Sequence, residues 1–240
     1  MNTLKRNFPN FITLSNLFCG IISIICSFEN HLAWASIFIF IGIFLDFFDG
    51  FFARILKVEN KFGVELDSMA DLITSGLAPS IILFQIIRTQ TVALEYGLFT
   101  LPFSLISLLA FTIPISSAIR LAKFNLDENQ KEGFIGLPTP MTAVFIASIP
   151  LIYLEDHYEF YRSTEFLFLT AIIFSLLQIS TIKLFSLKFN FKYFTLDKLN
   201  IFRILILFIS IILFLLFNFS SIPFIVILYI ILSLINNFLK

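Results

Sequence analysis

The amino-acid sequence predicts an all-α integral membrane protein, and three observations lead to this fold class. Hydrophobic residues make up 58% of the chain and charged residues only 13%, whereas soluble domains carry about 25% charged residues. The mean hydropathy is +0.96. Apolar residues gather in long segments, and the basic residues concentrate in alternate connections between them. Basic and acidic residues are equal in number, at 16 each, which gives no sign of nucleic-acid binding.

Eight apolar segments are long enough, or nearly so, to cross a bilayer. With the N-terminus placed in the cytoplasm, every Lys and Arg lies inside except Arg88 and Arg162, as the positive-inside rule expects. We therefore predict about eight spans with both termini cytoplasmic, and a short interfacial helix around Pro9 before the first span. The segments run approximately over residues 11–28, 32–56, 73–88, 97–121, 138–154, 166–187, 200–217 and 222–238.

Four aspartates lie at the predicted cytoplasmic boundary of two consecutive helices. The second segment ends with Asp46 and Asp49, and the third helix begins with Asp67 and Asp71. A charged residue inside a span costs roughly 2.5–3.5 kcal/mol on insertion scales, so four carboxylates need neutralisation. Clustered carboxylate oxygens suit Mg²⁺ or Mn²⁺ rather than Zn²⁺. The pattern predicts a site for two divalent cations.

Helical periodicity brings these carboxylates together. At 100° per residue, the aspartates of each helix fall on one face, and a short turn makes the two helices antiparallel neighbours. Small residues share these faces and would let a ligand approach the backbone closely. The faces comprise Asp46, Asp49, Gly50, Ala53 and Arg54 on the first helix and Gly63, Asp67 and Asp71 on the second.

The spacing of these residues resembles the signature of the CDP-alcohol phosphatidyltransferase family. In this chain it reads Asp46-x2-Asp49-Gly50-x2-Ala53-Arg54-x8-Gly63-x3-Asp67-x3-Asp71. The resemblance implies a six-helix core in the inner (cytoplasmic) membrane, an active site facing the cytoplasm, and a homodimer. We expect this core, with the interfacial helix, at residues 1–187 and two additional C-terminal transmembrane helices at 188–240. For these two helices we expect a structural or dimer role rather than chemistry.

The resemblance also implies a role for each matching residue. Asp46, Asp49 and Asp67 would ligate the metal ions, and Asp71 would both contact a metal and act as the general base. Asn60 stands where many members carry Ser or Thr, and its amide can still donate a hydrogen bond. The expected CDP-diacylglycerol contacts are Asn10, Thr13, Gly50, Ala53, Arg54, Asn60 and Gly63.

Three further segments, residues 62–79, 120–125 and 134–140, resemble the bacterial members that use serine. Two departures are Lys123, where Arg is commoner, and Thr74-Ser75, where Ser-Phe is usual. The expected acceptor contacts are Arg120, Lys123, Asn125 and Ser75. Arg120 has an alternative interpretation, as an anchor whose long side chain reaches the membrane interface.

The resemblance implies that membrane-embedded CDP-diacylglycerol gives its phosphatidyl group to the hydroxyl of L-serine, forming phosphatidylserine and CMP. Two alternatives stay open. A different acceptor, such as glycerol 3-phosphate or an inositol phosphate, would bring a phosphate group and need more cations at the pocket. A metal-ion channel or transporter would explain buried carboxylates, but not the glycine, alanine and arginine residues placed among them.

Overall fold

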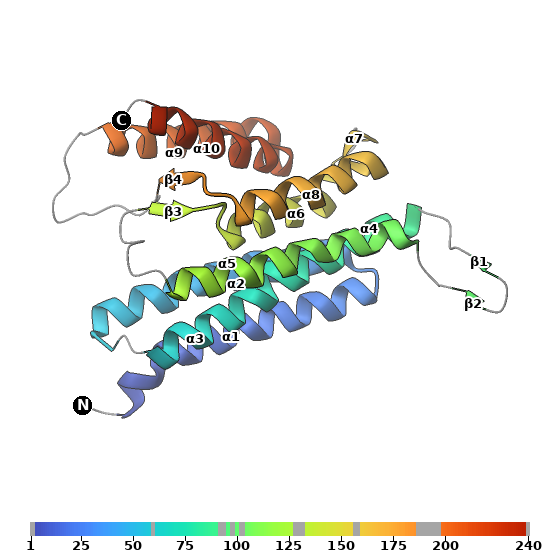
Figure 1. The fold of residues 1–240 in the computed structure, drawn as a ribbon. Helices are drawn as coiled ribbons and strands as arrows, with labels where there is room; N and C mark the ends of the chain where they lie inside the picture. Colours follow the sequence, from blue (N-terminus) through green and yellow to red (C-terminus); the bar gives the residue numbers. More distant parts are fainter. Residues whose placement is uncertain are drawn as a thin grey trace.

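Apolar helices run alongside one another in a single bundle (Figure 1). The computed structural model describes residues 3–58, 61–90, 95–96, 99–100, 104–126, 133–155, 159–185 and 198–238. The first half contains α1 (Thr3–Phe28), α2 (Leu32–Leu56), α3 (Lys61–Asp71), the π-helical segment η1 (Leu72–Leu77), α4 (Ala78–Gln90), the 3-10 segment η2 (Leu105–Phe111) and α5 (Thr112–Leu126). The second half contains α6 (Thr139–Ile152), α7 (Glu159–Arg162), α8 (Thr164–Ile179), α9 (Lys198–Phe217), η4 (Asn218–Ser220) and α10 (Ser221–Phe238).

The all-α membrane class is confirmed by helix length and composition. Five helical stretches are long and apolar enough to cross a membrane: Asn7–Phe28, Leu32–Leu56, Lys61–Gln90, Leu105–Leu126 and Asn200–Asn237. The last stretch contains both α9 and α10. They are separated at η4, where Asn218 adopts a positive φ of 45°. The shorter α6 and α8 occupy the fifth and sixth predicted segments. The chain is thus a multi-pass membrane protein, and the count of eight spans stays a prediction.

Two predicted boundaries were wrong, those of the fourth and the sixth segment. The helix expected around Pro9 is present and continuous with the first span, because α1 begins at Thr3, and its interfacial position stays a prediction. The fourth segment becomes helical only at Leu105, where the Ser104 hydroxyl accepts a hydrogen bond from the backbone N–H of Ile106. Before it, β1 (Glu95–Tyr96) and β2 (Phe99–Thr100) pair antiparallel.

The sixth segment ends at Ile179 rather than at residue 187, because the chain turns there into a strand. β4 (Lys183–Phe185) pairs antiparallel with β3 (Gly133–Ile135). Gly136 has φ +74°, and a Cβ at this position would collide with the carbonyl oxygen of Gln178. Its backbone N–H donates to the Ile182 carbonyl at 2.8 Å. Apolarity alone did not reveal this sheet, since strand and helix ends share the same residue types.

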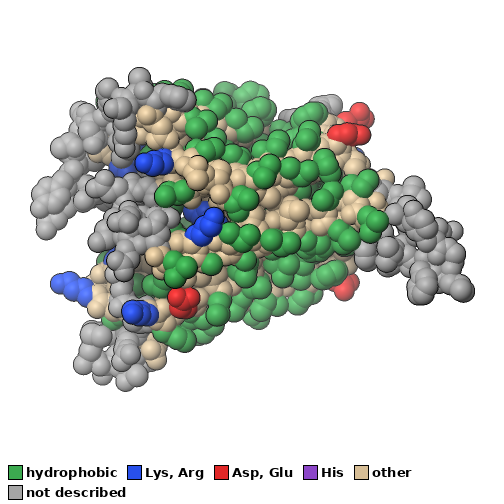
Figure 2. Space-filling view, viewed as in Figure 1, with side chains coloured by type: hydrophobic (Ala, Val, Ile, Leu, Met, Phe, Trp, Pro, Cys, Tyr) green, Lys and Arg blue, Asp and Glu red, His purple; other side chains and the backbone are tan. Residues whose placement is uncertain are grey.

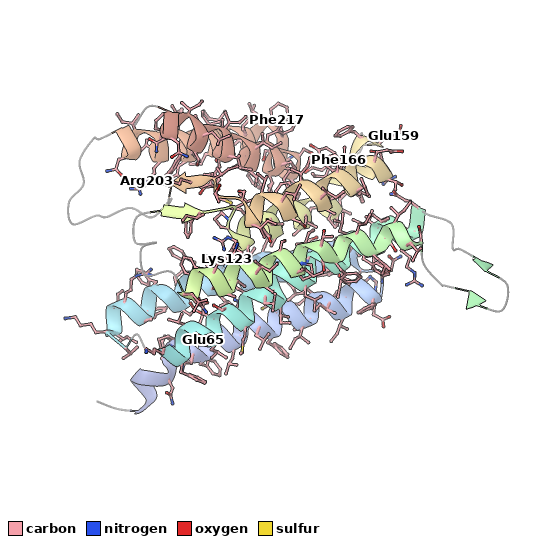
Figure 3. The ribbon with its side chains drawn as sticks, in the orientation of Figure 1. Glu65, Lys123, Glu159, Phe166, Arg203 and Phe217 are labelled. Carbon is pink, nitrogen blue, oxygen red and sulfur yellow. The ribbon has the colours of Figure 1, made fainter. Side chains whose placement is uncertain are left out.

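Both chain ends lie at the same end of the bundle, together with β3–β4 and the junction of α2 and α3 (Figure 1). The β1–β2 pair lies at the opposite end. Lys123 and Arg203 lie toward the first end and Glu159 toward the other (Figure 3). This placement of the two ends is compatible with the predicted topology, in which both termini lie on one side of the membrane.

The surface has the distribution that a lipid environment favours. On the face shown in Figure 2, hydrophobic side chains cover much of the middle, and acidic and basic groups are visible toward the two ends. Large side chains such as Phe18, Phe44 and Leu215 are exposed, which would be costly in water over so large an area. Small polar side chains lie inside instead, and the Ser23 hydroxyl donates to the Ala35 carbonyl of the neighbouring helix at 2.8 Å. Such contacts are typical of helix packing in membranes.

The π-helical segment η1 packs closely against α1 and α2. The Thr74 hydroxyl donates to the Asn16 carbonyl at 3.0 Å, and glycines face Thr74 from both helices, Gly20 on α1 and Gly42 on α2. A Cβ added at Gly42 would lie 2.5 Å from Thr74 Cγ2 and 2.9 Å from Asn16 Oδ1. This contact fixes η1 against α1 and α2. It thereby also positions the start of α4, which follows η1 directly.

We expect Gly42→Ala to destabilise the protein by about 1–3 kcal/mol, because backbone and side chain must shift to relieve the overlap. Thermal unfolding in detergent measures the loss. Thr74→Ser removes Cγ2 but keeps the hydroxyl, so the double variant should recover part of the stability. Equal melting temperatures for Gly42→Ala and the unmodified protein would contradict the close packing.

Candidate active site

The C-terminal half of α2 and the first turns of α3 bring three of the predicted aspartates together. Carboxylate oxygens of Asp46, Asp49 and Asp67 all lie within 4.8 Å of one another. Asp49 is buried and the other two are partly buried. Three carboxylates this close repel one another unless a cation lies between them. The donor set contains only oxygen, which suits Mg²⁺ or Mn²⁺.

Asp71 lies beside this cluster, one helical turn beyond Asp67. It is buried, and its Oδ1 has no hydrogen-bond partner among the described residues. The carboxyl groups of Asp67 and Asp71 are both within hydrogen-bonding reach of Asp46. A buried carboxylate oxygen with no protein partner is costly. Three of the four predicted aspartates thus meet closely, and Asp71 lines the same cavity beside them.

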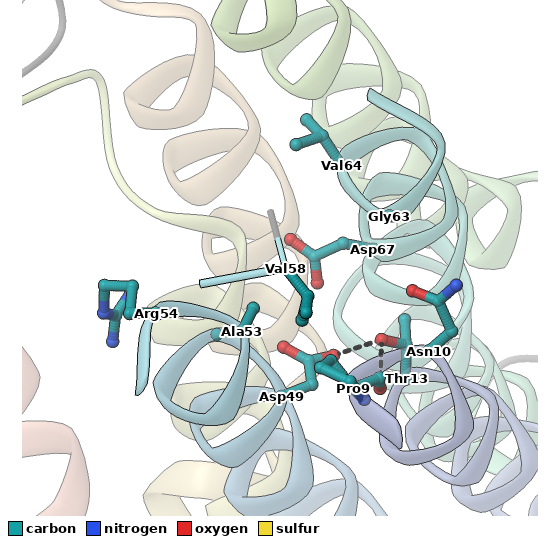
Figure 4. A pocket seen from close by; sticks show the side chains of 11 residues that line it. Pro9, Asn10, Thr13, Asp49, Ala53, Arg54, Val58, Gly63, Val64 and Asp67 are labelled. Atoms are coloured by element: carbon teal, nitrogen blue, oxygen red, sulfur yellow. Dashed lines mark hydrogen bonds between the residues drawn. The ribbon is translucent and has the colours of Figure 1, made fainter. Parts of the chain in front are cut away.

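A first cavity of about 190 Å³ opens between α1, the end of α2 and the start of α3 (Figure 4). The carboxylates of Asp49 and Asp67 point toward each other across it. The Thr13 hydroxyl approaches Asp49 Oδ2 at 2.6 Å and the Pro9 carbonyl at 3.1 Å. Six of the seven predicted CDP-diacylglycerol contacts line this cavity: Asn10, Thr13, Gly50, Ala53, Arg54 and Gly63. The seventh, Asn60, lies outside the described residues.

We expect Thr13→Val to raise the KM for CDP-diacylglycerol by about two- to tenfold, the worth of one hydrogen bond. Valine keeps the shape of threonine but leaves Asp49 without its hydroxyl donor. Steady-state CMP release against CDP-diacylglycerol concentration measures the change. Ser15→Ala is the matched control, because its hydroxyl donates to the Phe11 carbonyl on an exposed side of the same helix. A Thr13 variant that behaves like the Ser15 variant would remove this role.

A second cavity of about 510 Å³ adjoins the same cluster and shares Asp49, Gly50 and Asp67 with the first cavity. Asp46, Asp67 and Asp71 line it, and so do Arg120 and Asn125 at the end of α5. Its apolar walls come from α2, α6 and the β3 region, through residues such as Ile43, Phe134, Met141 and Val144. A long apolar wall beside a charged cluster suits a substrate that has a polar head and lipid chains.

Arg120 points into the protein rather than toward an interface. Its side chain is 7% exposed, and its Nε has no hydrogen-bond partner among the described residues. The guanidinium carbon lies 6.0 Å from the centre of the Phe134 ring, within cation–π range. Burial of an arginine without a full set of partners argues against the anchor interpretation and for an anionic ligand.

The other three predicted acceptor contacts, Asn125, Lys123 and Ser75, lie in different places. The Asn125 amide donates to Ser68 Oγ at 3.0 Å and to Glu65 Oε2 at 3.3 Å, which ties α5 to α3 at the second cavity. Lys123 instead lines a neighbouring cavity with Arg120. Ser75 is buried in η1 and is not among the residues that line these cavities.

Among the cavity-lining residues that the sequence did not single out, one comes from the C-terminal helices. Tyr229 of α10 lines the second cavity with Asp71 and Arg120, although the C-terminal helices were expected to take no part in chemistry. The available signal was a tyrosine hydroxyl in the middle of an otherwise apolar segment, since a buried hydroxyl needs a partner.

Comparison with known proteins agrees with this geometry. The sequence pattern of the CDP-alcohol phosphatidyltransferase family matches residues 6–180. The CDP-diacylglycerol–serine O-phosphatidyltransferase of Bacillus subtilis is 39% identical over 60% of this chain and 76% of its own length. The Helicobacter pylori protein of the same name is 34% identical over 79% of this chain and 77% of its own. An archaetidylserine synthase of Methanothermobacter thermautotrophicus is 28% identical over 60% of this chain and 57% of its own. The chain belongs to the CDP-alcohol phosphatidyltransferase family.

Proposed function

We propose that this phosphatidyltransferase moves the phosphatidyl group of CDP-diacylglycerol to the hydroxyl of L-serine and releases CMP. The observation that carries the proposal is the convergence of Asp46, Asp49 and Asp67, with ligand oxygens within 4.8 Å, beside the unpartnered oxygen of Asp71. The names of the Bacillus and Helicobacter relatives support serine as the acceptor.

Two divalent cations, Mg²⁺ or Mn²⁺, fit the acidic cluster. Asp46, Asp49, Asp67 and Asp71 would hold them, because these carboxylates supply oxygen ligands at close range. A bound divalent ion supplies charge neutralisation for a diphosphate. The first cavity would hold the cytidine diphosphate through the backbone at Gly50 and Gly63, the polar groups of Asn10 and Thr13, and the charge of Arg54.

The reaction then needs two contributions from the chain, a base and a group that holds the acceptor. Asp71 accepts the proton of the serine hydroxyl at its free oxygen. The serine oxygen attacks the phosphorus that carries diacylglycerol, the bond from this phosphorus to the CMP oxygen breaks, and CMP leaves. Arg120 holds the serine carboxylate at the second cavity, so that the hydroxyl faces the cluster.

The domain division, membrane side and assembly belong to the same proposal. We place the catalytic core at residues 1–187 and regard 188–240 as an added helical hairpin. The active site would face the cytoplasm from the inner membrane, since the excess of Lys and Arg lies in connections at this end. A homodimer is expected, and sedimentation in detergent of known bound mass tests it.

The deciding experiment is CMP release by purified protein with CDP-diacylglycerol and one acceptor at a time. Serine should support release and yield phosphatidylserine by mass spectrometry. Release only with glycerol 3-phosphate or an inositol phosphate would replace serine as the acceptor. Ion flux in liposomes without CMP release would favour the channel alternative and end the proposal.

We expect Arg120→Ala to raise the KM for serine by about 10- to 100-fold, the worth of a hydrogen bond to a charged group. The KM for CDP-diacylglycerol should change little. Arg88→Ala is the control. This arginine lies in the last turn of α4 and lines neither cavity at the acidic cluster, and its guanidinium donates to Gln85 Oε1 at 3.4 Å. An unchanged serine KM in Arg120→Ala would show that this residue does not bind the acceptor.

A further inference from the structure

The C-terminal hairpin of α9 and α10 reaches the catalytic cavity through one side chain. Tyr229 is 1% exposed and lines the second cavity together with Asp46, Asp71 and Arg120. Its hydroxyl lies within electrostatic range of the Arg120 guanidinium. The hairpin therefore forms a wall of the cavity on the side where the acceptor would bind.

Tyr229 also holds the strand that supports this wall. Its hydroxyl donates to the Phe185 carbonyl of β4 at 2.8 Å, and the two rings lie edge to face at 5.5 Å. Further along α10, the Asn237 amide donates to the Lys183 carbonyl of the same strand. These carbonyls are two residues apart, so both face the edge of β4 that β3 does not cover. Backbone groups on such an edge need partners in an apolar setting.

A short chain of contacts then leads from Tyr229 to the cationic group. β4 pairs with β3, in which Phe134 lies opposite Leu184. Phe134 in turn lies beneath the Arg120 guanidinium. Because the tyrosine proton is engaged by Phe185, its oxygen faces other groups as a hydrogen-bond acceptor. Both the support of Arg120 and the volume of the cavity thus depend on α10.

We infer that Tyr229 is a specificity-determining residue, which limits the size of the acceptor alcohol and positions Arg120 to bind it. This inference rests on the proposed phosphatidyl transfer. It assigns the C-terminal hairpin a part in acceptor selection beyond the structural role that its composition predicts. The acceptor class that fits is a small hydroxylated amino acid, whose carboxylate the buried Arg120 guanidinium can bind while its hydroxyl faces Asp71.

Two substitutions distinguish the contribution of the Tyr229 hydroxyl from that of its ring. Tyr229→Phe should raise the serine KM by about two- to tenfold, since β4 loses one hydrogen bond and Arg120 loses part of its support. Tyr229→Ala should open the cavity, and raise kcat/KM for threonine relative to serine by about tenfold, the worth of one carbon in a pocket. The KM for CDP-diacylglycerol should change less than the serine KM in both variants, since Tyr229 does not line the first cavity, where the cytidine diphosphate would bind.

Tyr153 offers the matched control. It is a half-buried tyrosine whose hydroxyl donates to the Tyr161 carbonyl at 2.8 Å, and it lines neither cavity at the acidic cluster. Tyr153→Phe and Tyr153→Ala should leave serine KM and acceptor preference unchanged. If Tyr229→Ala does not fold, Tyr229→Leu takes its place, and Tyr229→Phe still tests the hydroxyl.

The inference is overturned if the Tyr229 variants change serine KM and acceptor preference no more than the Tyr153 variants, or change only the melting temperature. α10 would then serve as a cover for β4 alone. Failure of the proposed function is separate and visible in the unmodified protein. If that protein releases CMP with another acceptor, the same variants are assayed with that acceptor and an analogue one carbon larger.

Discussion

Asp71→Asn should reduce CMP release by about 10²–10⁴-fold, the contribution of a positioned general base. Asparagine has nearly the same shape but cannot take a proton at neutral pH. Asp71 is buried beside Asp46, and its Oδ1 has no partner among the described residues. The loss should appear in kcat, because proton transfer belongs to the chemical step. Steady-state CMP release at saturating CDP-diacylglycerol and serine measures it.

The control must distinguish a role of Asp71 as general base from a role as metal ligand. Mn²⁺ binding, followed by electron paramagnetic resonance on the same samples, should fall far less than turnover in Asp71→Asn. Glu165→Gln makes the same chemical change at an exposed residue of α8 and should leave both quantities unchanged. A parallel loss of Mn²⁺ affinity and turnover would make Asp71 a ligand only, and near-normal turnover would remove it from the chemistry.

The acidic site was predictable because helical geometry is regular. Asp46 and Asp49 on α2 and Asp67 and Asp71 on α3 are placed by a rise and rotation per residue that hold in any helix. The turn between the helices is short, so their faces had to meet. The same regularity fixed the positions of Gly50 and Gly63 on the lining of the first cavity.

The features that the sequence did not reveal depend on contacts between distant segments. The β3–β4 pair joins residues about fifty positions apart, and its strands carry no alternating pattern that marks them as strands. Tyr229 reaches the cavity only because α10 packs against β4 and α6. Ser75 fails as a cavity residue for a related reason, since η1 packs it into the helix interface. Local periodicity does not encode such pairings.

Removal of divalent cations should abolish CMP release, and Mg²⁺ or Mn²⁺ should restore it. The expectation follows from three carboxylates with oxygens within 4.8 Å, whose mutual repulsion a cation relieves. The melting temperature of the protein should also fall when a chelator removes the ions, since an ion that binds only the folded state stabilises it. Calcium should restore less activity, because it favours more ligands at longer distances than Mg²⁺.

Asp46→Asn tests the role of a single carboxylate in metal binding. It should weaken Mn²⁺ binding at least about 10- to 100-fold, the usual cost of disturbing even an outer partner of a metal site, and turnover should fall with it. Glu159→Gln, at the opposite end of the bundle (Figure 3), should bind Mn²⁺ as the unmodified protein does. If Asp46→Asn binds Mn²⁺ normally, the cluster of Asp46, Asp49 and Asp67 is not the metal site. If chelation leaves CMP release intact, the carboxylates must be neutralised by protons instead, and the reaction would have to rely on Arg54 and Arg120 for its positive charge.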